Sequence, residues 1–161
     1  MGVRQLDLPA IDNLGRVYAP FDVGGRLEVR QSANSGADWF PVATLPAGRG
    51  LTSFAIEPWK STLVVGAGSD GGVNLVEWRA LVVVALDGGV PVPVPVAPLS
   101  TAAAAHPWAT TTNGSLVAFW AVGSSGVVLR VLDVGSGQVH TLGEPVSANE
   151  LGPVPELRWV E

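Results

Sequence analysis

The stretch of sequence that decides the fold covers residues 61–86. It begins with STLVVGA at residues 61–67, continues with GSDGG at residues 68–72, and ends in the apolar run LVVVAL at residues 81–86. The segments at residues 61–67 and 81–86 are rich in Val and Leu, which favour strands. The Gly, Ser and Asp at residues 68–72 favour a tight turn. Two strands joined by so short a connection predict an antiparallel hairpin, because parallel strands need a long crossover.

The same pattern is found on both sides of this hairpin. Residues 25–31 (GRLEVRQ) alternate apolar and charged side chains, as half-buried strands do, and residues 32–36 supply the turn that follows. Residues 115–122 (SLVAFWAV) precede a turn at residues 123–126, which leads into another Val-rich run. The chain also contains 20 Gly and 13 Pro among 161 residues, which argues against a helical bundle because helix interiors disfavour both residues.

The tryptophans indicate a repeat. Trp59 and Trp108 each follow a proline and are 49 residues apart, and Trp159 lies 51 residues after Trp108. About four strands in ~50 residues is typical of the blades of β-propellers. The three tryptophans are therefore candidates for two roles, packing between repeats or stacking on a ligand.

We accordingly expect an all-β chain of repeated antiparallel hairpin sheets, similar to about three blades of a β-propeller. The alternative is a β-sandwich or jelly roll, in which turns are similarly spaced. The single domain of residues 1–161 would then divide into units at about residues 15–46, 51–98 and 99–144, with a closing strand at residues 154–160. Alternating prolines at residues 90–98 predict an extended connector or an edge strand after the second unit.

Residues 32–39 (SANSGADW) combine turn residues with a tryptophan. Asn34 can hydrogen-bond the turn backbone, Gly36 supplies a positive φ angle, and Trp39 packs the hairpin onto the next strand. With Ser32, the stretch resembles the Asp-box (Ser-x-Asp-x-Gly-x-Thr-Trp) of sialidase-like β-propellers, although it has Asn in place of the Asp and Asp in place of the Thr. The resemblance implies a propeller fold and not a reaction, because the Asp-box is structural in those families and lies away from their active sites.

The composition argues against several kinds of site. A net charge of −5, with nine Lys and Arg in total, does not build the basic face that nucleic acids require. The absence of Cys excludes thiolate ligands, and His106 and His140 show no spacing that indicates a metal site. No motif for a nucleophile or a cofactor is recognisable, so we expect no cofactor, no metal and no enzymatic activity.

The sequence also bears on where the protein is made. Residues 1–20 do not show the basic flank and apolar run of a signal peptide. The apolar run at residues 81–86 is far shorter than the ~20 residues of a membrane helix and predicts a buried strand. We therefore expect a protein that is made in the cytoplasm without a signal peptide and without membrane insertion.

Three function classes fit this architecture. About three blades cannot close a ring, since propellers have four or more, and open edges favour association. We therefore expect a non-enzymatic assembly protein that binds other copies of itself or another structural subunit, most concretely a virion component such as a phage tail, fibre or head-decoration subunit. One alternative is a lectin-like module in which Trp59, Trp108 and Trp159 stack on a surface glycan. The other is a fragment of an Asp-box glycoside hydrolase, which would need two facing carboxylates.

Overall fold

The computed structural model describes residues 3–45, 50–87, 92–94, 99–102, 106–122, 124–147 and 157–159. Over these ranges the chain forms 14 β-strands and no helix, which confirms the predicted all-β class. The strands make three antiparallel sheets that follow one another along the sequence. The described part of the chain thus contains no helix that could cross a lipid bilayer.

The three sheets have similar strand orders. Sheet 1 consists of β1 (Val3–Gln5), β2 (Ala10–Ile11), β3 (Val17–Val23), β4 (Arg26–Ser32) and β5 (Phe40–Thr44). Sheet 2 consists of β6 (Ser53–Pro58), β7 (Thr62–Asp70), β8 (Leu75–Ala85), β9 (Val92–Val94) and β10 (Leu99–Ala102). Sheet 3 consists of β11 (Trp108–Thr110), β12 (Leu116–Val122), β13 (Val127–Asp133) and β14 (Val139–Val146). The orders are β1-β3-β4-β5, β6-β7-β8-β10 and β11-β12-β13-β14, with β2 also paired to β3 and β9 to β8.

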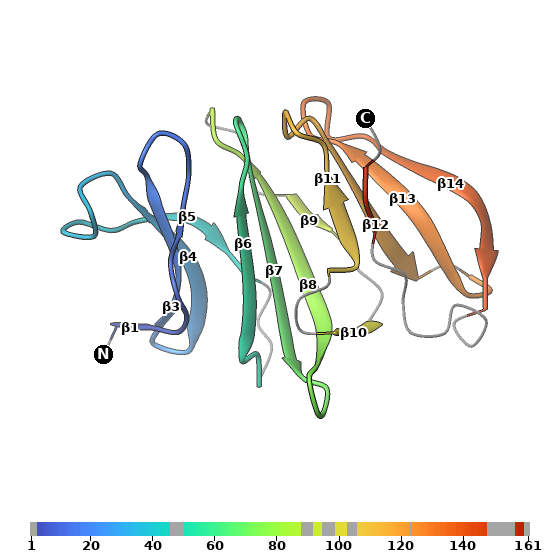
Figure 1. Cartoon of the computed structure of the whole chain (residues 1–161), viewed down its shortest axis with the longest axis horizontal. Helices are drawn as coiled ribbons and strands as arrows, with labels where there is room; N and C mark the ends of the chain where they lie inside the picture. The colour runs from blue at the N-terminus through green and yellow to red at the C-terminus, as the bar shows by residue number, and fades with distance from the viewer. Residues whose placement is uncertain are drawn as a thin grey trace.

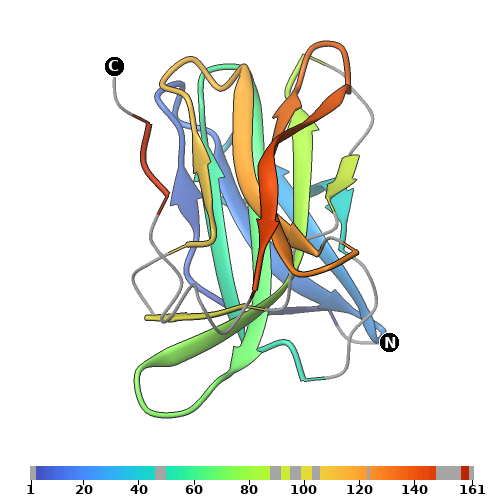
Figure 2. The same cartoon turned by 90° about the vertical axis from the view of Figure 1, so that its right-hand side faces the viewer.

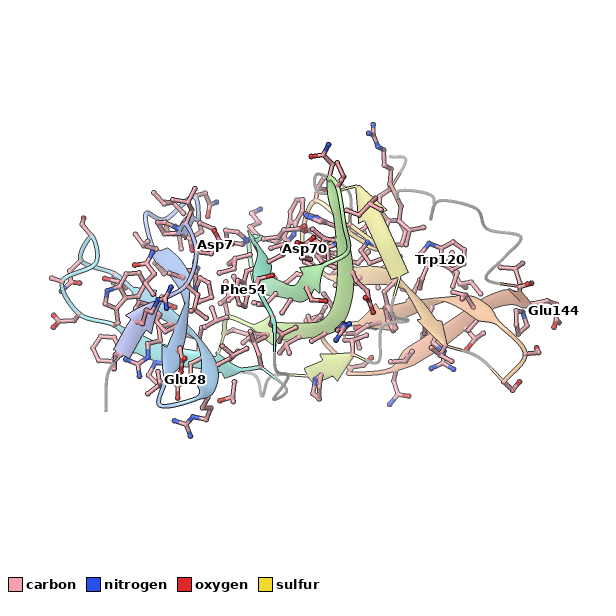
Figure 3. The ribbon with its side chains drawn as sticks, turned by 90° about the horizontal axis from the view of Figure 1, so that it is seen from below. Asp7, Glu28, Phe54, Asp70, Trp120 and Glu144 are labelled. Carbon is pink, nitrogen blue, oxygen red and sulfur yellow. The ribbon has the colours of Figure 1, made fainter. Side chains whose placement is uncertain are left out.

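The sheets stand in a row in the order of the sequence (Figure 1). Viewed along that row, they lie one behind another (Figure 2). Figure 3 shows Phe54 of sheet 2 between Glu28 of sheet 1 and Glu144 of sheet 3, and nearer to Glu28. Sheet 2 therefore has a neighbouring sheet on each side.

Both faces of sheet 2 are buried. Along β8, Ala80, Val82 and Val84 join the core against sheet 1, whereas Leu81 and Val83 join the core against sheet 3. Strands that are covered on both faces have uninterrupted apolar sequences. This explains the apolar run of β8 and confirms the predicted buried strand.

The two cores differ in composition. The core between sheets 1 and 2 contains aliphatic side chains and one tyrosine: Tyr18, Val29, Ala43, Leu45, Leu63, Val65, Ala67, Ala80, Val82 and Val84. The core between sheets 2 and 3 contains larger aromatic rings, from Trp78, Trp108 and Phe119, together with smaller side chains. These rings extend to the edge of the gap, where the candidate site lies.

A β-bulge in β8 helps to build the aromatic core. Ala67 of β7 pairs with Ala80, but the next residue, Gly68, pairs with Trp78, so Arg79 is an extra residue in β8. A bulge reverses the side to which later side chains point. Trp78 consequently lies on the same side of sheet 2 as Leu81 and enters the core against sheet 3.

The sheet boundaries differ from the predicted units. β1 and β2 precede residue 15 but pair with β3, so sheet 1 begins earlier than the predicted unit at residues 15–46. β10 was expected to begin the third unit, but it pairs with β8 and belongs to sheet 2. Of the Pro-rich residues 90–98, the structure describes 92–94, which form β9. β9 pairs with β8 as an edge strand, where Pro93 is tolerated, so sheet 2 continues beyond β8 to β9 and β10. Of the predicted closing strand at residues 154–160, only residues 157–159 are described, and they form no strand.

Candidate ligand-binding site

A cavity of about 500 Å³ opens beside β6 and β11, the first strands of sheets 2 and 3. Its walls come from three distant parts of the chain: the end of β6, β11 with its flanks, and the C-terminal segment. The lining residues are Glu57, Trp59, His106, Trp108, Ala109, Thr110, Thr112, Leu157, Arg158 and Trp159. The three tryptophans selected by the repeat spacing therefore meet at one site.

These three tryptophans differ in burial. Trp108 is only 2% exposed and belongs to the core between sheets 2 and 3. Trp59 is half-buried and packs against the edge of that core. Trp159, from the C-terminal segment, is 37% exposed. Trp108 thus has the packing role, whereas Trp59 and Trp159 form walls that a ligand could reach.

Glu57 holds the aromatic rings of the cavity in place. Its Oε1 atom accepts a hydrogen bond from Trp108 Nε1 at 3.2 Å and contacts His106 Nδ1 at 2.6 Å. The His106 ring stacks on Trp108, with centroids 4.7 Å apart and planes 9° apart, and Trp78 meets both rings edge-on. No described residue donates a hydrogen bond to the other carboxylate oxygen of Glu57, whose side chain is 24% exposed. This carboxylate can therefore accept hydrogen bonds from a ligand.

A glycine makes room for the buried tryptophan of this network. Gly66 lies in β7, and a Cβ atom at this position would be 2.1 Å from the end of the Trp108 ring. A side chain of any size would therefore clash with the ring. Gly66 accounts for the close approach of β11 to sheet 2, which brings His106 next to Glu57.

Two polar atoms at the cavity have no hydrogen-bond partner among the described residues. They are the indole Nε1 of Trp59 and the Oγ1 of Thr110, a residue that is 8% exposed. Buried polar groups are nearly always hydrogen-bonded, and an unsatisfied one costs about 1–3 kcal/mol. Both atoms are themselves buried, so they belong to the wall behind the cavity and do not face its open space.

The charged groups of this cavity are few. Glu57 is the single acid and Arg158 the single strong base among the described lining residues. No group of three or more His, Cys, Asp or Glu in the described ranges is arranged to hold a metal ion. The arrangement provides aromatic walls and a small number of hydrogen-bonding groups.

A second cavity, of about 430 Å³, adjoins the first. Trp59 and Thr112 line both cavities. The remaining walls come from the loop after β2, the turn after β6 and the turn after β11, with Asp12, Lys60 and Asn113 among the polar residues. The turns after β6 and β11 lie at the same end of their sheets (Figure 1).

Asp12 is the centre of a closed hydrogen-bond network beside this second cavity. Its Oδ1 accepts from the backbone N–H groups of Leu14 and Arg16, both at 2.9 Å, and its Oδ2 accepts from Arg16 Nε at 2.6 Å and the Tyr18 hydroxyl at 3.1 Å. Burial alone would raise the pKa of Asp12, but these hydrogen bonds outweigh it and lower the pKa. Burial raises the pKa of Tyr18 to about 12, and the negative charge of Asp12 adds to that effect against the opposing charge of Arg16.

The predicted turn at residues 32–39 joins β4 to β5 and lies in sheet 1. The Ser32 hydroxyl accepts from Gly36 N at 2.9 Å and donates to Asn34 Oδ1 at 2.8 Å. Gly36 has a φ of +90°, and the Trp39 ring packs next to it and edge-on against Phe21. These four predicted residues thus build a hairpin turn, and they do not contribute to the cavity at Trp59.

No protein-family model matches this sequence, and no curated protein shows significant similarity to it. The resemblance of residues 32–39 to the Asp-box therefore stays a prediction.

Sequence reasoning did not select Glu57, His106 or Thr110 as site residues. A signal for the first two is nevertheless present, because both precede a Pro-Trp pair and they are 49 residues apart. Equivalent positions in neighbouring repeats are often neighbours in space. An acid at one such position and a histidine at the next therefore predict a contact, which the structure contains. Thr110 gives no comparable signal, because its burial depends on which face of β11 turns inward.

Proposed function

We propose that this protein is a carbohydrate-binding module and that the cavity between Trp59 and Trp159 is its binding site. The observation that supports this best is the convergence of three tryptophans, from distant parts of the chain, on one cavity. Ligand sites typically have volumes of about 300–1,000 Å³, with aromatic walls and a few polar groups. This cavity has all three properties.

The chemistry of the walls suits a sugar. A sugar ring presents an apolar C–H face and a rim of hydroxyl groups. The exposed parts of Trp59 and Trp159 offer flat apolar surfaces for such a face. The free oxygen of Glu57 would accept hydrogen bonds from hydroxyl groups, and hydrogen bonds to a charged group are stronger than neutral ones.

The same cavity gives less support to hydrolysis. Retaining and inverting glycosidases use two carboxyl groups on opposite sides of the scissile bond. Glu57 is the single carboxylate among the described lining residues. The absence of enzymatic activity accordingly stays part of our proposal.

We further propose that the three sheets are propeller-like blades. Each sheet is an antiparallel meander entered at one edge, and consecutive sheets pack face to face in a row. A β-sandwich has two sheets, so this repeated packing favours the propeller-like alternative. Three blades would form an open arc.

Assembly with a second copy of the chain is the second candidate function, and the outer face of sheet 3 favours it. Phe119 of β12 points into the core, so the next residue, Trp120, lies on the outer face of the sheet. The strand register places Trp120, Leu129 and Leu142 in one row across β12, β13 and β14. Leu142 is 48% exposed and Val122, in the neighbouring row, 61%. Since the chain already packs sheet on sheet twice, the outer face of sheet 1 in a second copy is the occupant that we propose.

Light scattering tests this assembly. We expect dimers or larger species that dissociate when Leu142 is replaced by Glu, with Glu144→Gln as a control on the same strand. A monomer at all concentrations would contradict it. The virion role stays a prediction of the sequence.

The carbohydrate site is tested with a glycan array followed by calorimetry on the best binder. We expect Trp59→Ala and Trp159→Ala each to weaken binding by at least about tenfold. Trp39→Ala is the matched control, because Trp39 is also half-buried but lies in sheet 1, and it should change affinity less than twofold or so. Circular dichroism confirms that each variant is folded. Binding to no glycan, or equal affinities for all variants, would refute the proposal.

A further inference from the structure

We infer that the ligand is an extended glycan, not a single sugar, and that it carries a carboxylate-bearing unit bound beside Lys60. This inference rests on the proposed carbohydrate site and adds a second subsite to it. The observation that supports it is the second cavity, which is lined by Lys60 and shares Trp59 with the first.

The two cavities are neighbours of similar size. Their volumes are about 500 and 430 Å³, and Trp59 and Thr112 line both of them. A ligand that fills only the first cavity would not contact the parts of Trp59 and Thr112 that line the second cavity. A chain of sugars that crosses Trp59 would contact both, and the indole is the side chain best suited to lie under such a chain.

The second cavity spans all three sheets. Ile11 ends β2 and Asn13 lies in the loop that connects β2 to β3, whereas Lys60 comes from the turn after β6 and Asn113 from the turn after β11. The first cavity reaches the C-terminal segment at Trp159, so the linings of the two cavities together extend from β2 to that segment. Linings that draw on so many parts of the chain favour a ligand of several units.

The polar groups that face the second cavity are mainly hydrogen-bond donors. Asp12 lines it, but its side chain is 1% exposed and its two oxygens already accept four hydrogen bonds. The side-chain oxygen of Asn113 accepts from the Thr111 hydroxyl and from the N–H and hydroxyl of Ser115, which leaves the amide NH₂ as the group it offers. Asn13 adds an amide that can both donate and accept, so the described lining offers more donors than acceptors, with Lys60 as its one cation.

Lys60 decides the charge of the group that would bind there. It is the single lysine of the chain, it is exposed, and it forms no ion pair with any described residue. An ammonium group and amide donors together match a carboxylate, because charge-assisted hydrogen bonds are about twice as strong as neutral ones. Neutral sugars would leave this cation without a partner of opposite charge.

The test compares glycans of different length and charge. From the array, the best acidic binder is obtained as a disaccharide, a tetrasaccharide and a carboxyl-reduced tetrasaccharide, and each is titrated by calorimetry into the full chain. We expect the acidic tetrasaccharide to bind about tenfold more tightly than the other two. Lys60→Met should remove the advantage of the acidic over the carboxyl-reduced tetrasaccharide, whereas Arg4→Met, which removes an exposed cation elsewhere, should preserve it.

The outcomes separate this inference from the proposal on which it rests. Equal affinity for the disaccharide and the tetrasaccharide, with loss on Trp59→Ala, would overturn the extended ligand and leave the carbohydrate site intact. Equal affinity for the acidic and the carboxyl-reduced tetrasaccharide, or no effect of Lys60→Met, would overturn the acidic unit. Binding of no glycan would overturn both.

Discussion

Asp12 and Glu57 each bind an aromatic side chain through a carboxylate oxygen, but one carboxylate is closed off from solvent and the other is open. Asp12 accepts the hydroxyl of Tyr18, and its side chain is 1% exposed. Glu57 accepts the indole N–H of Trp108, and its side chain is 24% exposed beside a cavity. Glu57 lines the first cavity and Asp12 the second, and Trp59 lines both.

The difference in exposure shows how a carboxylate next to an aromatic ring can belong to a structural site in one case and to a candidate binding site in the other. All four hydrogen bonds to the Asp12 carboxylate come from residues that follow it in the same part of the chain, at most six positions away. The partners of Glu57 come from β11 of sheet 3 and from His106 just before it, about 50 residues away, and they occupy one of its two oxygens. A carboxylate that is satisfied locally stabilises the fold, whereas one that bridges two sheets with an oxygen left over can also bind a ligand.

The largest expected effect comes from separating the two sheets that hold the Glu57 network. Gly66→Ala places a methyl group 2.1 Å from the Trp108 ring, which cannot move easily because Trp78 and His106 pack against it. We expect a loss of about 3 kcal/mol in the free energy of unfolding. Denaturant unfolding followed by circular dichroism measures it.

A second substitution and a control make this test specific. Adding Trp108→Phe removes the ring atoms that clash and should restore part of the lost stability. Gly135→Ala is the control, because a Cβ there would be 3.5 Å from its nearest neighbour, an ordinary contact. A Gly66→Ala protein as stable as the wild type would show that sheets 2 and 3 are not packed as closely as the structure indicates.

The next effect concerns the closed carboxylate. Asp12→Asn removes the charge that Arg16 and Tyr18 bind, and we expect a loss of about 2 kcal/mol at neutral pH. The pKa of Asp12 is lower in the folded state than its ordinary value of 3.8. Its contribution is therefore complete above pH 3.8 and is lost as the pH falls through the lower folded pKa.

Urea unfolding at neutral pH and at about pH 3 measures this dependence. The free energy of unfolding of the wild type should fall between the two pH values because Asp12 becomes protonated. That of Asp12→Asn should fall by less, because the variant lacks this carboxylate. Asp87→Asn serves as a control, because Asp87 is exposed. If Asp12→Asn follows the acid dependence of the wild type, the closed network does not contribute as proposed.

The sequence predicts much of the local structure and less of the arrangement between sheets. The hairpin at residues 61–86 and the turn at residues 32–39 follow from residue types that act over a few positions. The assignment of β10 to sheet 2 does not, because the prolines before it are compatible with a connector or with an edge strand. Which of these forms depends on whether β8 has a free edge, and local sequence does not contain that information.

The candidate site shows the same limit. The spacing of Trp59, Trp108 and Trp159 selects residues that meet at the cavity, because a repeat brings equivalent positions near one another. It does not separate the buried Trp108 from the two wall residues. That distinction depends on Gly66, a residue of another sheet, which lets the Trp108 ring enter the core.

The smallest expected effect on stability is that of the open carboxylate, and it distinguishes the two groups most directly. Glu57→Gln keeps an oxygen that can accept the hydrogen bond from Trp108 Nε1 but removes the charge beside His106. Because this pair is partly exposed, we expect a loss of about 1 kcal/mol or less in the free energy of unfolding. Glycan affinity should fall by about tenfold, since a charged acceptor is lost from the cavity wall. Asp12→Asn should show the reverse, with a larger loss of stability and a smaller change in affinity for short glycans. Unfolding curves and calorimetry on both variants would contradict the distinction if Glu57→Gln destabilised the fold as much as Asp12→Asn and left binding unchanged.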